Sequence, residues 1–242
     1  MASPILSAYS TSDFLGKLIF LSLGALSILS WIIILYKLWL SSNLEKTAAH
    51  LHHFLKKNIR SPLNIDIRSF DNQTGAPNPF LSLYKILKNQ VIDLLKKNKE
   101  LMAFDTQKAV FLSSTDIEQL GSQVDMKIYL EKKKLQKYLF VLSVIFSLAP
   151  LLGLLGTVWG ISVTFNQMPQ SAGALSNEAV LSGLAMALGT TVVGILVAIP
   201  ALVFYYYLKN RIEDYTDKMD LFSSELLQSI EMQYRAVDVK SL

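Results

Sequence analysis

Three long apolar runs without a charged side chain divide this sequence. They cover residues 18–36, 138–165 and 179–208. A helix of about 20 apolar residues crosses the roughly 30 Å hydrocarbon core of a bilayer, so each run is predicted to be a transmembrane helix. The second and third runs have 28 and 30 residues. We expect them to tilt or to project beyond the hydrocarbon into water.

The first run has one alternative reading, a secretory signal peptide. Three features argue against it: no basic residue precedes Lys17, the apolar stretch is long, and no small-residue cleavage site follows. Tyr36, Lys37 and Trp39 close the run instead, as aromatic and basic anchors close a membrane helix at the interface. We therefore expect the first run to be a membrane anchor.

Lys and Arg are distributed unevenly around the three runs. None lies in residues 1–16 or in the short hairpin 166–178, whereas 17 lie in residues 37–137 and five in the tail 209–242. Short segments on the cytoplasmic side of a membrane carry the excess of these residues. We expect the N-terminal segment 1–17 and the hairpin to lie outside the cytoplasm, and the long segment and the tail to lie inside it.

The first half of the long segment shows one helix and one loop. Ser41 or Ser42 is expected to cap a helix that runs to about Asn58. The stretch 60–79 contains three of the seven prolines and a glycine, which predicts a loop. Helical spacing resumes near Phe80.

The second half of the long segment is predicted to be helical and to enter the membrane without a break. Thr115 and Glu118 have the spacing of a capping box at its start. An apolar stripe at helical spacing follows, formed by Ile117, Leu120, Val124 and Ile128. The tail is predicted to be helical to about Val237, continuing the third span. Together these elements favour a helical bundle beneath the membrane.

Composition excludes several kinds of chemistry. The chain has no cysteine, so disulfides and thiolate sites are excluded. The histidines cluster at residues 50–53 without acidic partners nearby, which favours a solvated helix surface over a metal site. A basic run at residues 132–137 directly precedes the second span, so lipid headgroups are its expected partner and not nucleic acid. No nucleophile–base pair appears, so we expect neither an enzyme nor a cofactor.

The second span carries two stripes at helical spacing. One is rich in hydroxyl groups and consists of Ser143, Ser147, Pro150, Leu154, Thr157, Ile161 and Thr164. The other consists of the small residues Ala149, Gly153, Gly156 and Gly160. Small residues let helix backbones approach closely in lipid, which predicts a packing face.

The third span repeats this arrangement. Its small-residue face holds Gly183, Ala187, Thr191, Gly194 and Ala198, with Thr190 beside it. At 1.5 Å per residue, Thr157 and Thr191 lie roughly 12 and 18 Å from the outer ends of their spans. Pro150 and Pro200 are predicted to kink the two helices.

Two interpretations of the hydroxyl groups are open. Ser and Thr in membrane helices often bond a carbonyl of their own helix and have no further role. The matched depth of two threonines beside glycine stripes makes a polar pathway an equal alternative. The candidate lining residues of that pathway are Thr157, Thr191, Thr190, Ser147, Ser143 and Thr164. A proton path normally uses an ionisable relay, which neither span contains, so a partner chain must supply one.

The motifs of these two spans resemble the ExbB/TolQ family, which is related to the flagellar stator protein MotA. The matching strings are GLLGTVWGI at 153–161 and GLAMALGTTVVGILVAIPA at 183–201. The first span, with SILSWIIIL at 27–35, looks slightly closer to TolQ. Residues 40–115 show no resemblance beyond length and helical character.

The resemblance implies an all-α protein of the bacterial inner membrane with a periplasmic N-terminus and a cytoplasmic C-terminus. It implies a homopentamer whose second and third spans line a pore, with pore threonines at Thr157 and Thr191. An ExbD- or TolR-like partner with one span places a membrane aspartate in that pore. Proton flow then drives movement passed to a TonB- or TolA-like protein. One departure stands out: Met186 occupies a position where the family usually has glutamate.

Two other functions compete with this proton-driven motor. A structural membrane scaffold would use the glycine faces for oligomer packing alone. A transporter acting by itself is disfavoured, because three spans without an internal repeat leave no binding site within one chain.

Overall fold

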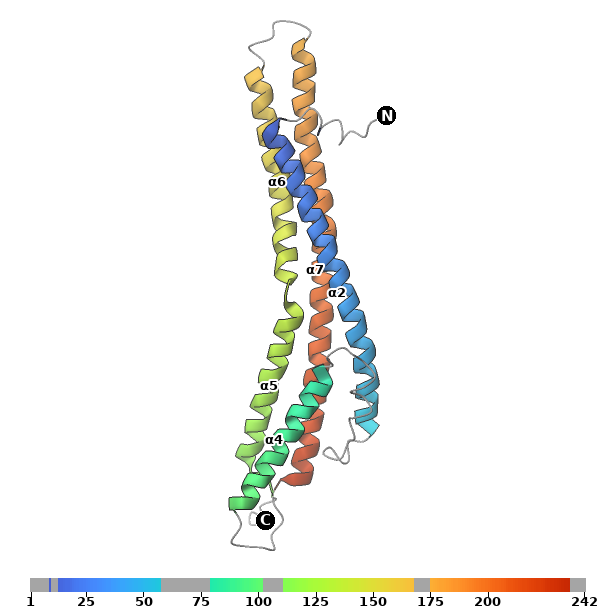
Figure 1. Ribbon diagram of the computed structural model, residues 1–242, viewed down its shortest axis with the longest axis vertical. Helices are drawn as coiled ribbons and strands as arrows, with labels where there is room; N and C mark the ends of the chain where they lie inside the picture. Colours follow the sequence, from blue (N-terminus) through green and yellow to red (C-terminus); the bar gives the residue numbers. More distant parts are fainter. Residues whose placement is uncertain (1–8, 10–12, 58–78, 102–110, 168–174, 236–242) are drawn as a thin grey trace, which may run out of the picture. The chain divides into compact units, whose positions relative to one another are not determined.

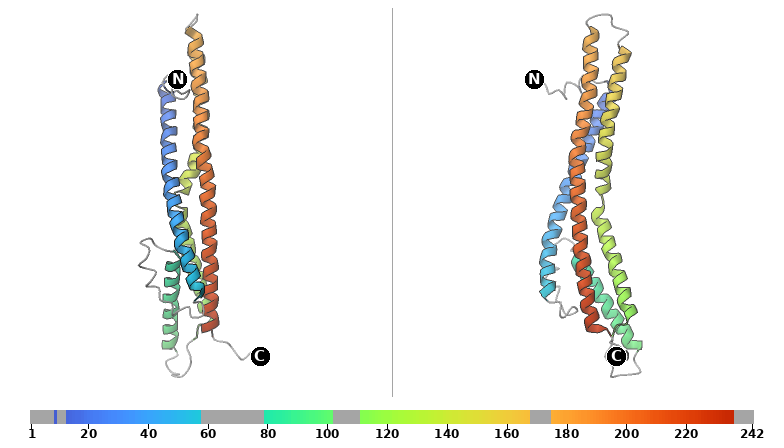
Figure 2. Two further views of the ribbon diagram at one scale, coloured as in Figure 1. Left: turned by 90° about the vertical axis from the view of Figure 1, so that its right-hand side faces the viewer. Right: turned by 180° about the vertical axis from the view of Figure 1, so that it is seen from behind.

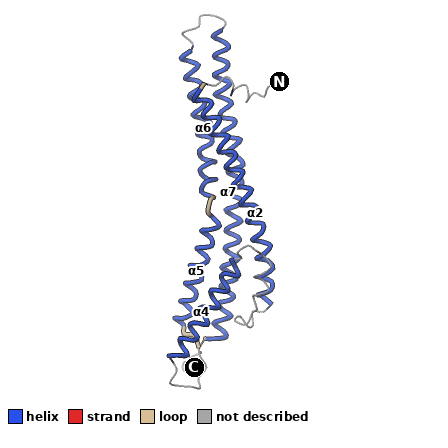
Figure 3. The backbone as a smooth tube through the Cα atoms, in the orientation of Figure 1, coloured by secondary structure: helices blue, strands red, loops and turns tan. Residues whose placement is uncertain are grey.

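The computed structural model describes residues 9, 13–57, 79–101, 111–167 and 175–235. The elements found among these residues are α-helices, apart from an isolated bridge between Leu112 and Arg235 (Figure 3). In chain order the helices are α2 (Phe14–Lys57), α4 (Pro79–Leu101), α5 (Ser114–Gln136), α6 (Leu139–Gln167) and α7 (Leu175–Tyr234), labelled in Figure 1. The all-α prediction is confirmed for the described part of the chain.

The chain divides into two compact units. Unit 1 comprises residues 1–39 and 137–210, and unit 2 comprises residues 40–136 and 211–242. Within the described residues, three helices are long and apolar enough to cross a membrane, which agrees in number with the three predicted spans. Their candidate segments are Phe14–Ser42, Leu139–Asn166 and Gly183–Tyr234.

In unit 1, α6 and the first part of α7 are antiparallel neighbours (Figures 1 and 2). Large apolar side chains such as Leu151, Val158 and Leu188 stay exposed on these helices. A membrane helix presents such side chains to lipid, whereas a helix in water hides them against a core. The α2 helix packs beside this pair, with the ring of Trp31 6.3 Å from that of Phe204 on α7.

The α2 helix runs further in both directions than the first apolar run. It begins after Asp13, whose side chain accepts a hydrogen bond from the Gly16 amide at 3.0 Å, the geometry of an N-cap. It continues through Ser41 and Ser42 to Lys57. The predicted cap at these serines is therefore wrong, because no Gly or Pro after Gly24 interrupts the helical backbone.

A break between α5 and α6 contradicts the prediction of one continuous helix. It lies at Tyr138, which adopts a φ of 73°, in the left-handed region. The ammonium groups of Lys37 and Lys137 lie 5.9 and 5.0 Å from the centre of the Tyr138 ring. Cation–π contacts of this kind offset part of the strain of the backbone. No Gly or Pro marks the position, so the sequence pattern gave no sign of the break.

The α5 helix starts with a capping box, two residues before the predicted one. The Ser113 amide donates to the Asp116 carboxylate at 2.9 Å, and the Asp116 amide donates to the Ser113 hydroxyl at 3.1 Å. The predicted pair Thr115 and Glu118 is therefore wrong. The short Asp116 side chain reaches back to the first residue and closes the pair, a role more often filled by Glu or Gln.

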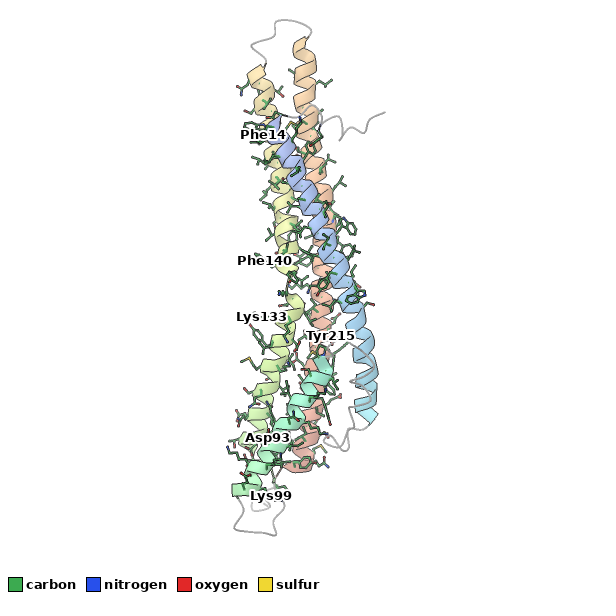
Figure 4. All side chains as sticks on the ribbon, in the orientation of Figure 1. Phe14, Asp93, Lys99, Lys133, Phe140 and Tyr215 are labelled. Atoms are coloured by element: carbon green, nitrogen blue, oxygen red, sulfur yellow. The ribbon has the colours of Figure 1, made fainter. Side chains whose placement is uncertain are left out.

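Unit 2 has its own apolar core, formed by α4, α5 and the second part of α7. The ring of Phe80 lies 5.4 Å from that of Tyr215, labelled in Figure 4, and 5.6 Å from that of Phe222. The stripe predicted on α5 contributes to this core through its buried members Leu120, Val124 and Ile128. Helix α4 begins at Pro79, next to the predicted Phe80. Most of the predicted loop 60–79 lies outside the described residues.

Candidate functional site

The small-residue stripe of α6 faces α7. A Cβ atom added at Gly153 would lie 3.0 Å from the Thr190 carbonyl oxygen. One added at Gly160 would lie 3.0 Å from the Gly183 carbonyl oxygen and from the Ala187 Cβ. These distances are tighter than ordinary van der Waals contact, so the two backbones pack closely along this stripe, and a side chain at either glycine would force its neighbours to shift.

The facing stripe on α7 makes the reciprocal contacts. A Cβ atom at Gly194 would lie 2.6 Å from the Ala149 carbonyl oxygen, and one at Gly183 would collide with the Thr164 hydroxyl. Ala187 and Ala198 are buried on the same side of α7. The structure therefore brings the residues expected to pack the helices into one interface. Pro150 and Pro200 lie inside α6 and α7, respectively.

Two of the six candidate pathway residues lie inside this interface. Thr190 has no exposed surface, and its side chain fills the space that the missing Cβ of Gly156 leaves open. Its hydroxyl donates to the Ala187 carbonyl at 2.8 Å. Thr164 is also buried and donates to the Gly160 carbonyl at 2.8 Å. Within one chain, both threonines contact the neighbouring helix.

Thr191 connects the two helices directly. Its hydroxyl donates to the carbonyl oxygen of Gly153 at 3.1 Å, across 38 residues of sequence. The absence of a side chain at Gly153 brings that carbonyl within reach. The Thr191 side chain is half-buried, so it lies at the edge of the interface.

The remaining candidates lie on the hydroxyl stripe of α6, outside the closest contact with α7. The Thr157 hydroxyl donates to the Leu154 carbonyl at 2.6 Å, and that of Ser143 donates to the Phe140 carbonyl at 2.7 Å. Both residues are half-buried, and Ser147 is exposed. These bonds stay within α6, so they do not hold α6 to α7.

Met186 lies against α2. Its side chain is 4% exposed and forms a cluster with Phe20, with Trp159 and Val193 packed against it. A Cβ atom added at Gly16 would collide with the Met186 methyl group. Met186 therefore makes an apolar contact with the first span.

The sequence pattern did not single out Asp13, which contacts Trp159 of α6. The indole Nε1 donates to the Asp13 carboxylate at 2.7 Å. Asp13 directly precedes an apolar run, which is the usual signal of an N-cap, so its role at the start of α2 was detectable from sequence. The contact with Trp159 was not detectable, because 146 residues separate the two partners.

Comparison with known proteins extends over most of the chain. The MotA/TolQ/ExbB proton channel family matches residues 96–221. The biopolymer transport protein ExbB of Helicobacter pylori is 39% identical over 107 residues, which cover 43% of this chain and 73% of that protein. ExbB of Aquifex aeolicus is 32% identical over 113 residues, covering 47% of this chain and 72% of that protein.

One relative, a Tol-Pal system protein, aligns with nearly the whole chain. The Tol-Pal system protein TolQ of Pseudomonas aeruginosa is 27% identical over 220 residues, covering 90% of this chain and 89% of that protein. The family match covers both glycine-lined spans and the helices that lead to and from them, which is more than half of the sequence. The chain therefore belongs to the MotA/TolQ/ExbB proton channel family.

Proposed function

We propose that this chain is the channel-forming motor subunit of an inner-membrane complex of the ExbB–ExbD or TolQ–TolR type. Such a complex uses the proton motive force to energise outer-membrane transport or to maintain envelope integrity. The observation that carries the proposal is the paired wall of α6 and α7. Glycines join the two helices. Three residues of the hydroxyl stripe, Ser143, Ser147 and Thr157, stay outside the closest contact, whereas Thr164 is buried in it.

The wall has no proton relay of its own. Spans 138–165 and 179–208 contain no ionisable side chain except tyrosine. A proton path in a membrane normally uses carboxylates or histidines. We propose that an ExbD- or TolR-like protein with one span supplies an aspartate, and that Thr157 and Thr191 line its path together with the other hydroxyl residues. The role is not catalytic, in keeping with a family of channel proteins.

The proposed topology follows the distribution of Lys and Arg. Residues 1–17 and the hairpin 166–178 lie in the periplasm, and residues 37–137 and 209–242 lie in the cytoplasm. Unit 2 then belongs to the cytoplasmic part, which agrees with its ordinary apolar core. The three spans between these segments are residues 18–36, 138–165 and 179–208.

The proposed assembly is a homopentamer around the partner helices, as the family resemblance implies. A TonB- or TolA-like protein receives the movement. The TolQ relative aligns with 90% of this chain, whereas the two ExbB relatives align with less than half of it. This coverage supports a Tol-type arrangement.

A structural scaffold is the alternative, since the glycine contacts alone would also assemble an oligomer. Reconstitution into liposomes separates the two functions. The chain is inserted with and without the aspartate-bearing partner, and proton uptake is followed under an imposed potential. We expect flux only with the partner. Flux that is absent in both preparations, although the complex is intact by mass, would identify a scaffold.

A further inference from the structure

The two carboxylate oxygens of Asp13 have separate partners. Oδ1 accepts the hydrogen bond from the Gly16 amide at 3.0 Å and so caps α2. Oδ2 accepts the hydrogen bond from the Trp159 indole at 2.7 Å and so joins α2 to α6. An N-cap needs one acceptor atom, which Ser, Asn or Asp can all provide. The indole bond requires the second oxygen, so Asp13 does more than begin a helix.

The surrounding contacts place this bond in a close junction of the three membrane helices. Gly16 leaves the space that the Met186 side chain of α7 enters. One turn further along α2, Phe20 packs on Met186. The ring of Tyr9 lies 6.0 Å from that of Phe20, edge to face. The start of α2 therefore contacts α7 through apolar groups and α6 through the carboxylate.

In the topology proposed above, the junction lies near the periplasmic ends of the spans. Trp159 is eight residues from the end of α6 at Gln167, or about 12 Å along the helix axis. Asp13 directly precedes the first candidate span, and a carboxylate beside membrane helices is expensive unless partners satisfy it. Here the described partners are an indole N–H and a backbone amide, and both are donors.

Trp159 and Thr157 lie on opposite sides of α6. Two residues along a helix correspond to a rotation of about 200°. When the hydrogen bond holds Trp159 toward α2, it therefore also holds Thr157 on the side of α6 that faces away from α2. Thr190 in the space beside Gly156 and the Thr191 bond to Gly153 hold α6 against α7. The Asp13 bond adds a restraint on the rotation of α6 from the side of α2.

We propose that Asp13 is a positioning residue, which holds Trp159 and thereby sets the orientation of the Thr157 stripe. Its effect on proton flux rests on the function proposed above, whereas the bond itself does not. Asp is required at this position because an amide such as Asn has only one oxygen. In Asp13→Asn the amide group would face the indole N–H, and two donors would meet.

The bond is tested first by the indole resonances of the full-length protein in nanodiscs. The chain has three tryptophans, and Trp159→Phe identifies the signal of Trp159. Asp13→Ser and Asp13→Asn keep a helix cap but remove the second oxygen. We expect both variants to move the Trp159 N–H signal upfield and to leave the other two in place. A Trp159 signal that neither variant moves would overturn the proposal.

The positioning role is tested by proton flux in liposomes with the aspartate-bearing partner. We expect Asp13→Ser and Trp159→Phe to lower the flux about tenfold, since misplacing a reacting group by an ångström costs up to roughly 10²-fold. The double variant is expected to be no worse than either single one, because both remove the same bond. Gly24→Ala, where an added Cβ meets nothing within 4 Å, is the control.

The outcomes separate the two proposals. Wild-type flux in Asp13→Ser, despite a moved indole signal, would overturn the positioning role and leave the proposed function intact. Absence of flux in the wild type with its partner would contradict the proposed function, while the indole signals would still decide whether the bond exists. Additive losses in the double variant would also contradict the positioning role.

Discussion

The hydroxyl of Thr191 on α7 donates a hydrogen bond to the carbonyl of Gly153 on α6 at 3.1 Å. Hydrogen bonds between membrane helices contribute about 0.6 to 2 kcal/mol, since the separated helices also find partners in lipid. We expect Thr191→Val to destabilise the α6–α7 pair by that amount. Thr191→Ser keeps the donor and is the matched control. Thermal unfolding in one detergent, followed by circular dichroism, measures the difference, and equal midpoints for both variants would contradict the contact.

Gly156 is predicted to tolerate no side chain. A Cβ atom there would collide with the Thr190 hydroxyl and lie 2.6 Å from the Thr190 Cβ. Thr190 is fully buried, so it has nowhere to move. Overpacking of this kind costs typically 1 to 3 kcal/mol, so Gly156→Ala is expected to lower the thermal midpoint.

Two further variants make the Gly156 test specific. Gly24→Ala lies on α2 with open space around the added Cβ, so it should be neutral or slightly stabilising. Thr190→Gly removes the colliding atoms and should recover part of the stability of Gly156→Ala. If the two alanine variants unfold at the same temperature, the close contact at Gly156 is refuted.

Tyr138 holds a strained backbone at the break between α5 and α6, with a φ of 73°. Tyr138→Ala and Tyr138→Gly both remove the ring that contacts Lys37 and Lys137. Only glycine adopts this φ without cost, so Tyr138→Gly is expected to be more stable than Tyr138→Ala by about 1 kcal/mol. Chemical denaturation of both proteins measures the order, and the reverse order would show that the left-handed backbone is not maintained.

Two carboxylates of unit 2 are expected to make its stability depend on acid pH. Burial acts to raise the pKa of Glu131, but hydrogen bonds from Lys127 and Lys134 outweigh it and hold that pKa below its ordinary value of 4.5. Burial likewise acts to raise the pKa of Asp116, and the bonds from Ser113 and Asn98 hold it below its ordinary value of 3.8. A carboxyl group with a depressed pKa stabilises the fold above its ordinary pKa and loses that contribution as the pH falls through the depressed value.

Glu131→Gln tests this dependence. The variant should be less stable than the wild type at pH 7, where Glu131 binds Lys127 at 2.9 Å and Lys134 at 3.1 Å. The gap should begin to close below about pH 4.5, where Glu131 of the unfolded wild-type chain takes up a proton, and it should close further as the pH falls through the lower pKa of the folded protein. Thermal midpoints of both proteins between pH 7 and pH 3 give the comparison. A gap that stays constant with pH would show that the ion pairs add no stability.

Sequence predicted the features that repeat along the chain. The apolar runs gave the spans, and the glycine spacing placed Gly153, Gly156 and Gly160 on the face that meets α7. Single-residue events were not predicted. The break at Tyr138 has no Gly or Pro to mark it, and one of the two lysines near its ring is about a hundred residues away. The capping box at Ser113 uses an Asp where Glu or Gln is usual. A contact between residues far apart in the sequence, such as Asp13 and Trp159, does not produce a repeating pattern along the chain.

The sequence assigned all six hydroxyl residues to one pathway, whereas the structure places them in different environments. Thr164 and Thr190 lie one helical turn from Gly160 and Ala187, so they share the small-residue face and become buried in it. Thr157 is half-buried outside the closest contact with α7, and its hydroxyl donates to the Leu154 carbonyl of its own helix. Among the threonines, it is therefore the one whose loss should affect a proton path without loosening α6 from α7.

Proton flux through the Thr157→Val variant, reconstituted with the aspartate-bearing partner, tests the central claim most directly. Valine has nearly the same shape, and the lost bond lies within α6, so the thermal midpoint should change little. Thr157→Ser restores the hydroxyl and is the control. The account predicts that flux falls strongly in the valine variant and recovers in the serine variant. Wild-type flux through a stable Thr157→Val complex would contradict it.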